Sequence, residues 1–252
     1  QAQKTGLATV EMALRKLYGG DADGQVYLKA PGKEAAIVGR YELKGLQDGA
    51  ESKIALDVSD EVAGDGCYIL GLEQQSAGAY FSVTSARLLR GAQPIAQWEG
   101  EVTSRRTFQP PVLVPLQVGG VPAEIGRPAY ILRPDRIDRY WGNLGLDQAD
   151  ASNPPVLWGE GYAEFWLDVP TPGAWDVLLR YGGPAVRPCD IVIDGDDLHP
   201  FHMAARNRPV GPGPDDQLWE RQGTVTLEPG VQWVRLQDVL PDITGLWLRP
   251  AE

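Results

Sequence analysis

The chain has 252 residues, of which 43% are hydrophobic, and it carries 34 acidic against 23 basic side chains, a formal net charge of −11. Nucleic acids and anionic membranes bind basic surfaces, so this charge excludes them as expected partners. No run of 18 apolar residues occurs, so membrane insertion is not expected either.

The chain contains 30 glycines and 21 prolines, spread along its length. This distribution is typical of many short strands joined by tight turns. A chain of this length suffices for one large core or for two cores of about 120 residues each. We therefore predict an all-β protein with two β-sandwich, jelly-roll-like domains in tandem.

The sequence begins with Gln1 rather than Met, as expected if a secretory signal had been removed or the chain had been trimmed. We expect a secreted protein, extracellular or periplasmic. Cys67 and Cys189 each lie in an apolar, strand-like run, one in each half of the chain. They are either two buried thiols or an interdomain disulfide, and the sequence leaves both alternatives open.

The first half begins with an ambiguous segment, residues 6–20, which fits both a helical stripe and a strand. The alternation of Val10, Met12 and Leu14 favours a strand. Six β-branched or aromatic runs separated by turn residues predict further strands at 25–30, 35–43, 52–59, 66–74, 79–91 and 93–100. Residues 108–128 carry five prolines and predict a last strand followed by a stiff linker. We place the boundary near Gly120, which gives domains 1–120 and 121–252.

The second half predicts strands at 129–137, 189–198, 220–230, 231–239 and 243–250, with a long loop at 200–217 and a hairpin within 158–181. Alternation in this hairpin gives an inward face, made of Ala163, Phe165, Leu167, Val169, Trp175, Val177, Leu179 and Tyr181. Tyr162, Glu164, Trp166 and Asp168 point the other way. Trp166 either packs against a neighbouring loop or domain or forms, with Tyr162, a flat platform for a sugar edged by the charges of Glu164 and Arg180.

Four segments of this half, in order, carry a resemblance: "GYAEFWLDVPTPGAWDVLLRYGG" (161–183), "DIVIDG" (190–195), "LWERQGTVTLEPG" (218–230) and "VQWVRLQDVLPDITGLWL" (231–248). Together they resemble carbohydrate-binding modules of families 6 and 35, over residues 129–249. The resemblance implies a β-jelly-roll that binds an oligosaccharide or polysaccharide without catalysis. In such modules aromatic rings stack on the apolar faces of sugars.

The resemblance also implies site residues. Trp219 corresponds to the binding aromatic that precedes the strand "GTVTL", and its aromatic partner is expected among Tyr140, Trp141 and Trp158, in a loop. The loop before the last strand implies polar contacts from Asp238 and Asp242. A structural calcium is not expected, because Arg133 stands where the family commonly has a glutamate. More faintly, residues 66–100 resemble the accessory β-domain of bacterial hexosaminidases and fucosidases, with Gln97 and Trp98 in place of an acid–histidine pair.

Metal and catalytic sites are not expected. "HPFH" (199–202) with Asp194, Asp196 and Asp197 contains zinc-ligand types, but its spacing is that of a turn. "GGDADG" (19–24) lacks the remaining ligands of a calcium loop. Glu164 and Asp168 would lie about 13 Å apart along one strand, too far for paired-carboxylate hydrolysis. An alternative function is a structural subunit of an extracellular filament or surface layer, which would lend residues 6–14 as a strand to a neighbour.

Overall fold

The fold is given by a computed structural model, which describes residues 7–75, 79–104, 111–120, 127–147, 154–196, 199–211 and 216–251. Backbone contacts divide the chain into two compact units, Gln1–Ala123 and Glu124–Glu252, here called the N-unit and the C-unit. The predicted all-β class is confirmed, since the described part contains strands and one short 3-10 turn. The position of the boundary between independently folding domains stays a prediction.

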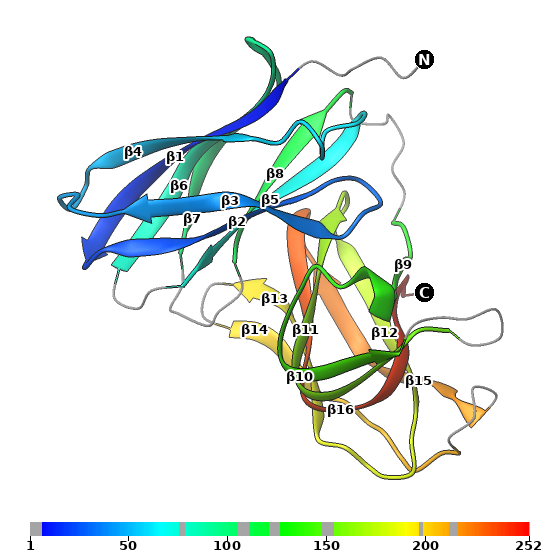
Figure 1. The fold of residues 1–252 in the computed structure, drawn as a ribbon. Coiled ribbons are helices and arrows are strands. Elements are labelled where there is room, and N and C mark those ends of the chain that lie inside the picture. The colour runs from blue at the N-terminus through cyan, green and yellow to red at the C-terminus, as the bar shows by residue number, and fades with distance from the viewer. Residues whose placement is uncertain are drawn as a thin grey trace. The chain divides into compact units, whose positions relative to one another are not determined.

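The N-unit is a sandwich of two antiparallel sheets, ordered β4-β1-β6-β7 and β3-β2-β5-β8 (Figure 1). Its strands are β1 (Ala8–Gly19), β2 (Ala22–Lys29), β3 (Ala35–Leu43), β4 (Glu51–Asp57), β5 (Gly66–Gln74), β6 (Ala79–Arg90), β7 (Gln93–Thr103) and β8 (Val112–Val118). Alternate residues of both sheets meet in one core, which includes Val10, Leu14, Leu28, Leu70, Phe81 and Leu116.

The strand predicted at the start of the chain is confirmed, but the strand-lending alternative loses its basis. β1 pairs with β4 on one side and with β6 on the other. Its backbone donors and acceptors are therefore already used inside its own sheet, and β1 offers no free edge to a neighbouring molecule.

The C-unit is one continuous hydrogen-bonded sheet of eight strands that folds over on itself at its last strand. Its elements are β9 (Tyr130–Leu132), the 3-10 turn η1 (Pro134–Arg136), β10 (Arg139–Asp147), β11 (Val156–Val169), β12 (Gly173–Gly182), β13 (Cys189–Asp196), β14 (His199–Ala204), β15 (Leu218–Leu227) and β16 (Gly230–Pro250). The predicted loop at 200–217 is thus partly wrong, because β14 occupies its beginning. β10 was not predicted as a strand.

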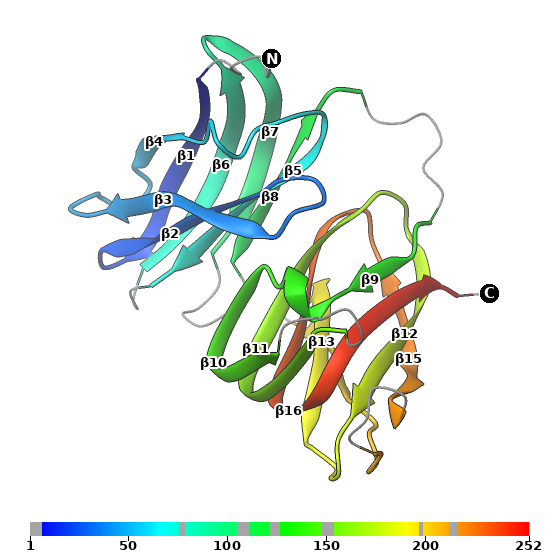
Figure 2. The ribbon, with the colours of Figure 1, turned by 45° about the vertical axis from the view of Figure 1, so that its right-hand side comes forward.

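β16 joins the two layers of the C-unit (Figure 2). Its first half pairs with β11 and β13, whereas its second half pairs with β12 and β9. We call β10, β11, the first half of β16, β13 and β14 the first sheet, and β9, the second half of β16, β12 and β15 the second sheet. Two strands were predicted where this single strand runs. Its bend coincides with Asp238, whose φ is 78°, and with Pro241.

The hairpin predicted within 158–181 is wrong in its pairing, although both of its strands exist. β11 and β12 lie in opposite sheets, and each pairs with β16 rather than with the other. Pro170 and Pro172 remove two backbone donors from the connection, so the chain crosses between layers instead of closing a ladder. The inward residues predicted from the alternation all belong to the C-unit core.

Both cysteines are free thiols, so the disulfide alternative is not realised in this structure. No helix in the described ranges is long and apolar enough to cross a membrane.

Candidate functional site

A row of paired residues crosses four strands of the C-unit at the bend of β16. Leu157 of β11 pairs with Ile243 of β16, Ile243 pairs with Tyr181 of β12, and Tyr181 pairs with Leu218 of β15. The first three of these side chains are buried in the core. Their chain neighbours flank this row: Trp158 and Asp242 lie on one side of it, and Trp219, which pairs with Arg180, lies on the other.

Trp158 lies at an irregularity in the pairing of β11 with β16. Between the pairs Leu157–Ile243 and Gly159–Leu240, Trp158 faces Pro241 and Asp242, neither of which pairs with a residue of β11. On its other side the indole lies over Gly145 of β10, where a Cβ atom would come within 2.4 Å of the ring. Only a residue without a side chain fits beneath the ring. Trp158 is 44% exposed and so offers a ring face to solvent.

Trp219, at the start of β15, uses the same arrangement on the other side of the row. Its ring lies over Gly245 of β16, where a Cβ atom would come within 3.3 Å of it. Trp247 meets it edge-on, with ring centroids 5.9 Å apart and an interplanar angle of 67°. Trp219 is 45% exposed. The sheet thus supports one side of the indole and leaves another side free.

Asp242 faces Trp158 at the β11–β16 irregularity and pairs with Gly182 of β12. Its carboxylate lies 3.6 Å from the position where a Cβ of Gly183 would stand. Gly182 and Gly183 are both buried, and the Gln217 side chain lies 3.2 Å from the position where a Cβ of Gly182 would stand. Thr244 Oγ1 donates to Gln217 Oε1 at 2.6 Å, next to Trp219. Trp219 lies two strand spacings of about 4.8 Å from Asp242, on the other side of the Tyr181 row.

The remaining predicted residues lie elsewhere. Tyr140 and Trp141 are exposed on β10, an edge strand rather than a loop, and Trp141 stacks on Tyr162 of β11. Asp238 pairs with Gly161 and Cys189 in the first sheet. Partial desolvation, together with the neighbouring Asp190 carboxylate, raises the pKa of Asp238. The structure therefore places Trp158 and Asp242 next to each other and Trp219 two strands from Asp242, whereas Tyr140, Trp141 and Asp238 lie in other rows of the first sheet.

Of the two alternatives for Trp166, the exposed platform is not realised in this structure. Trp166 is only 1% exposed, and its Nε1 donates to Glu164 Oε1 at 2.7 Å. Its backbone nitrogen donates to Asp138 Oδ2. The alternation along β11 correctly placed Trp166 on the face opposite the core. It could not show that this part of the face is buried.

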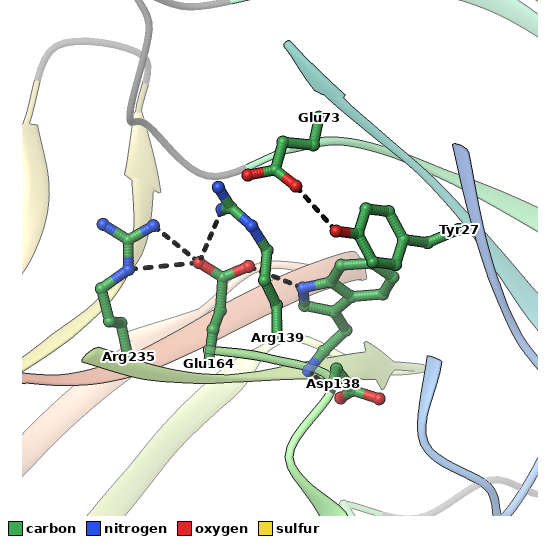
Figure 3. A network of polar contacts seen from close by, with 7 residues as sticks. Tyr27, Glu73, Asp138, Arg139, Glu164 and Arg235 are labelled. Carbon is green, nitrogen blue, oxygen red and sulfur yellow. Dashed lines mark hydrogen bonds and ion pairs between the residues drawn. The ribbon is translucent and has the colours of Figure 1, made fainter. Parts of the chain in front are cut away.

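Glu164 itself is fully buried between two arginines that face it across neighbouring strands (Figure 3). Arg235 donates to its Oε2 through Nη2 at 2.7 Å and through Nε at 3.2 Å, and Arg139 Nη1 lies 3.8 Å from the same oxygen. Arg235 also lies over the Tyr162 ring, 4.2 Å from its centroid. A carboxylate held in this way is structural. Figure 3 also draws a pair of the N-unit, in which Tyr27 donates to Glu73 at 2.7 Å.

In the part of the chain that can be described, the histidine segment contacts one carboxylate. His202 Nε2 lies 2.7 Å from Asp190 Oδ2. No group of three or more His, Cys, Asp or Glu side chains within the described ranges has the geometry of a metal site. Asp197 and the side chains of His199 and Asp196 lie outside the description. Arg133, expected at the place of a calcium-binding acid, pairs with Asp135 at 3.0 Å.

The sequence reasoning missed a polar cluster on the outer face of the second sheet. Asp176 of β12 accepts hydrogen bonds from Arg221 (2.7 Å), Thr224 (2.9 Å) and Arg249 (3.2 Å). Hydrogen bonds from Arg221 and then from Thr224 lower the pKa of Asp176 to about 2. Asp176 alternates with the inward residues Trp175 and Val177, so the sequence pattern predicts that it faces outward. Its partners come from β15 and β16, whose positions beside β12 no local pattern indicates.

No protein-family model and no curated protein matches the sequence. Among solved structures, the chain is similar to a family 35 carbohydrate-binding module from Clostridium thermocellum, with 19% identity, 49% of this chain and 99% of that chain covered, and a TM-score of 0.38. It is also similar to a family 35 module from Cellvibrio japonicus Abf62, at 17% identity, with 50% and 95% covered and a TM-score of 0.37. A third similar structure is the Podospora anserina GH26-CBM35 beta-(1,4)-mannanase, at 15% identity, with 49% of this chain but only 28% of that chain covered and a TM-score of 0.38. Similarity at this level assigns no function to the chain.

Proposed function

We propose that the C-unit binds carbohydrate without catalysis, at a site formed by Trp158, Asp242 and Trp219. The observation that carries the proposal is the repeated arrangement of two tryptophans. Each lies over a glycine of the neighbouring strand and keeps nearly half of its surface exposed. The sequence resemblance to carbohydrate-binding modules implies these three residues, together with Tyr140, Trp141 and Asp238.

The chemistry of these groups suits a sugar. The C–H face of a pyranose ring is apolar and packs on an aromatic plane, whereas its hydroxyls need polar partners close by. The Asp242 carboxylate accepts hydroxyl hydrogen bonds, and the Thr244–Gln217 pair adds donors and acceptors beside Trp219.

The arrangement of the acidic side chains in the C-unit fits carbohydrate binding better than glycoside hydrolysis. Glu164 is buried and held by two arginines, and Asp176 is held by two more. Asp242 is then a single carboxylate at the site, whereas glycoside hydrolysis commonly uses a pair about 5–10 Å apart. We further propose that the protein works outside the cytoplasm, where polysaccharides are met, as an accessory portion of a glycan-degrading or surface protein. Self-association and membership of a larger parent chain stay predictions.

Affinity electrophoresis tests the proposal. The protein is run in native gels that contain soluble polysaccharides such as xylan, galactomannan, β-glucan or arabinogalactan, next to gels without polymer. Retardation by at least one polymer is expected. Trp219→Ala and Trp158→Ala should each weaken it about tenfold or more. A ring and a sugar face that together bury about 80 Å² of apolar surface contribute about 2 kcal/mol.

Trp141→Ala is the matched control, because Trp141 is even more exposed but lies outside the site. This variant should bind like the unmodified chain. Retardation that survives both Trp158→Ala and Trp219→Ala but disappears in Trp141→Ala would place the site on β10 and overturn the proposed one. Circular dichroism of each variant checks that the fold is retained.

A further inference from the structure

The outer face of the second sheet continues beyond Trp219 in an ordered series of rows. The first row pairs Trp219 with Arg180 and Arg180 with Gly245. The next row runs from Arg221 through Leu178 to Trp247 and Ile131. The third runs from Thr224 through Asp176 to Arg249. Four residues along β12 separate the first row from the third, a distance of about 13 Å.

Two guanidinium groups on this face are fixed in place by one carboxylate. Arg221 and Arg249 reach Asp176 from opposite sides and bind its two different oxygens. The carboxylate side chain is 12% exposed, whereas the two arginine side chains are 56% and 47% exposed. Each guanidinium has five N–H donors and uses only part of them here. The cluster therefore presents oriented, unused donors to solvent and carries one net positive charge.

Aromatic and apolar groups connect this cluster to the proposed sugar site. Arg249 lies 5.7 Å from the centroid of the Trp247 ring, and Trp247 in turn meets Trp219 edge-on. Ile131 of β9 is 65% exposed in the same row as Trp247. A chain of sugar rings that leaves Trp219 along this face would cross an apolar strip before it reaches the guanidiniums.

Charge is distributed unequally along this face. Asp242 and Arg180 lie at the end with Trp219, and their formal charges cancel, whereas the two guanidiniums and Asp176 at the other end leave one net positive charge. A negatively charged substituent is therefore attracted at the second end. The chain as a whole carries a formal charge of −11, so it does not attract polyanions indiscriminately. Preference for an anionic glycan must therefore come from a local site.

We propose that Arg221 and Arg249 form an extension subsite for an oxyanionic substituent, a sulfate ester or a carboxylate, on a glycan whose uncharged ring packs on Trp219. The subsite rests on the proposed function, because it extends the same bound chain along the second sheet. Charge-assisted hydrogen bonds from an oriented guanidinium are stronger than neutral ones, and a planar fork matches an oxyanion in geometry. Asp176 acts through the two arginines and is a positioning residue.

The test compares one polymer backbone in three forms: hydroxyethyl cellulose, cellulose sulfate and carboxymethyl cellulose, and likewise dextran, dextran sulfate and carboxymethyl dextran. Affinity gels with each polymer give a dissociation constant for the full chain. At least one charged form should bind about tenfold more tightly than its neutral counterpart, and this gain should shrink as salt is added. Comparison of the sulfated with the carboxymethylated form identifies which oxyanion the subsite prefers.

The double variant Arg221→Gln/Arg249→Gln should lose the gain for the charged form and keep the affinity for the neutral form. The matched control is Arg40→Gln/Arg90→Gln, which removes the same charge from exposed positions of the N-unit and should keep the gain. The subsite is wrong if the tighter binding of the charged polymer is lost equally in both double variants, or if both double variants keep it. Thermal unfolding of each variant shows that its fold is intact.

Failure of the subsite and failure of the proposed function give different results. If neutral polymers bind through Trp158 and Trp219 but charged forms bind no better, only the subsite is wrong. If charged forms bind through the two arginines and Trp158→Ala and Trp219→Ala have no effect on any polymer, the sugar site is wrong and so is its extension.

Discussion

Replacing Glu164 by glutamine should destabilise the C-unit far more than an ordinary surface change. Glutamine has nearly the same volume, so it leaves no cavity, but it removes the negative charge that faces Arg139 and Arg235. Both arginines are buried, with relative exposures of 6% and 8%. Breaking a buried ion pair by removal of one partner costs about 3–5 kcal/mol, because the opposite charge remains buried without compensation. A domain is typically stable by only about 5–15 kcal/mol, so the loss should be obvious.

Urea unfolding followed by tryptophan fluorescence measures this effect. Seven of the eight tryptophans lie in the C-unit, so the signal reports mainly on that part of the chain. Glu160→Gln is the matched control. Glu160 lies on the same strand but is exposed, and its replacement should cost less than about 0.5 kcal/mol. If Glu164→Gln unfolds within about 1 kcal/mol of the unmodified chain, the two guanidiniums do not depend on this carboxylate, and the reasoning is wrong.

Three further predictions concern single groups. Gly245→Val should weaken carbohydrate binding about as much as Trp219→Ala in the affinity gels, because its side chain occupies the space beneath the Trp219 ring; unchanged binding would show that the flat ring position is not needed. Asp176 has a lowered folded-state pKa of about 2, so its contribution to stability is present above about pH 4 and is lost as the pH falls through 2. The melting temperatures of the unmodified chain and of Asp176→Asn should therefore differ at pH 5 and converge near pH 2, and a constant difference would contradict the assignment. Burial raises the pKa of the Cys189 thiol to about 12, so a thiol reagent at pH 8 should label the less buried Cys67 first, and Cys189 only after unfolding; equal labelling rates in the folded protein would refute this order.

The strands of the N-unit could be predicted nearly to the residue, because each apolar run ends at a clear turn signal. The expected strands at 35–43 and 66–74 coincide with β3 and β5. The buried face of a strand could also be predicted, since alternation along β11 and β12 identified the core residues of both strands. Alternation describes a single strand, however, and carries no information about which strand lies beside it.

The sequence interpretation failed to predict which strands pair with each other. β11 and β12 are separated by a short turn and were expected to pair, but each pairs with β16, more than 50 residues further on. The candidate site depends on the same long-range pairing. Trp219 and, among three candidates, Trp158 were expected as binding residues, and the pairing of β11 and β12 with β16 is what puts Trp158 beside Asp242 and Trp219 over Gly245. Alternation could not show whether an outward residue is covered, and for that reason it left the packing and platform alternatives for Trp166 open.

The single long strand β16 also has a consequence for how the C-unit folds. Four strands, β9, β11, β12 and β13, hydrogen-bond to it directly, and all of them precede it in the chain. During synthesis these strands emerge before their common partner, with open edges and apolar faces that cannot yet be covered. Contacts over such sequence separations form slowly, and unpaired edges promote aggregation. Completion of the C-unit is therefore a late event that waits for residues 230–250.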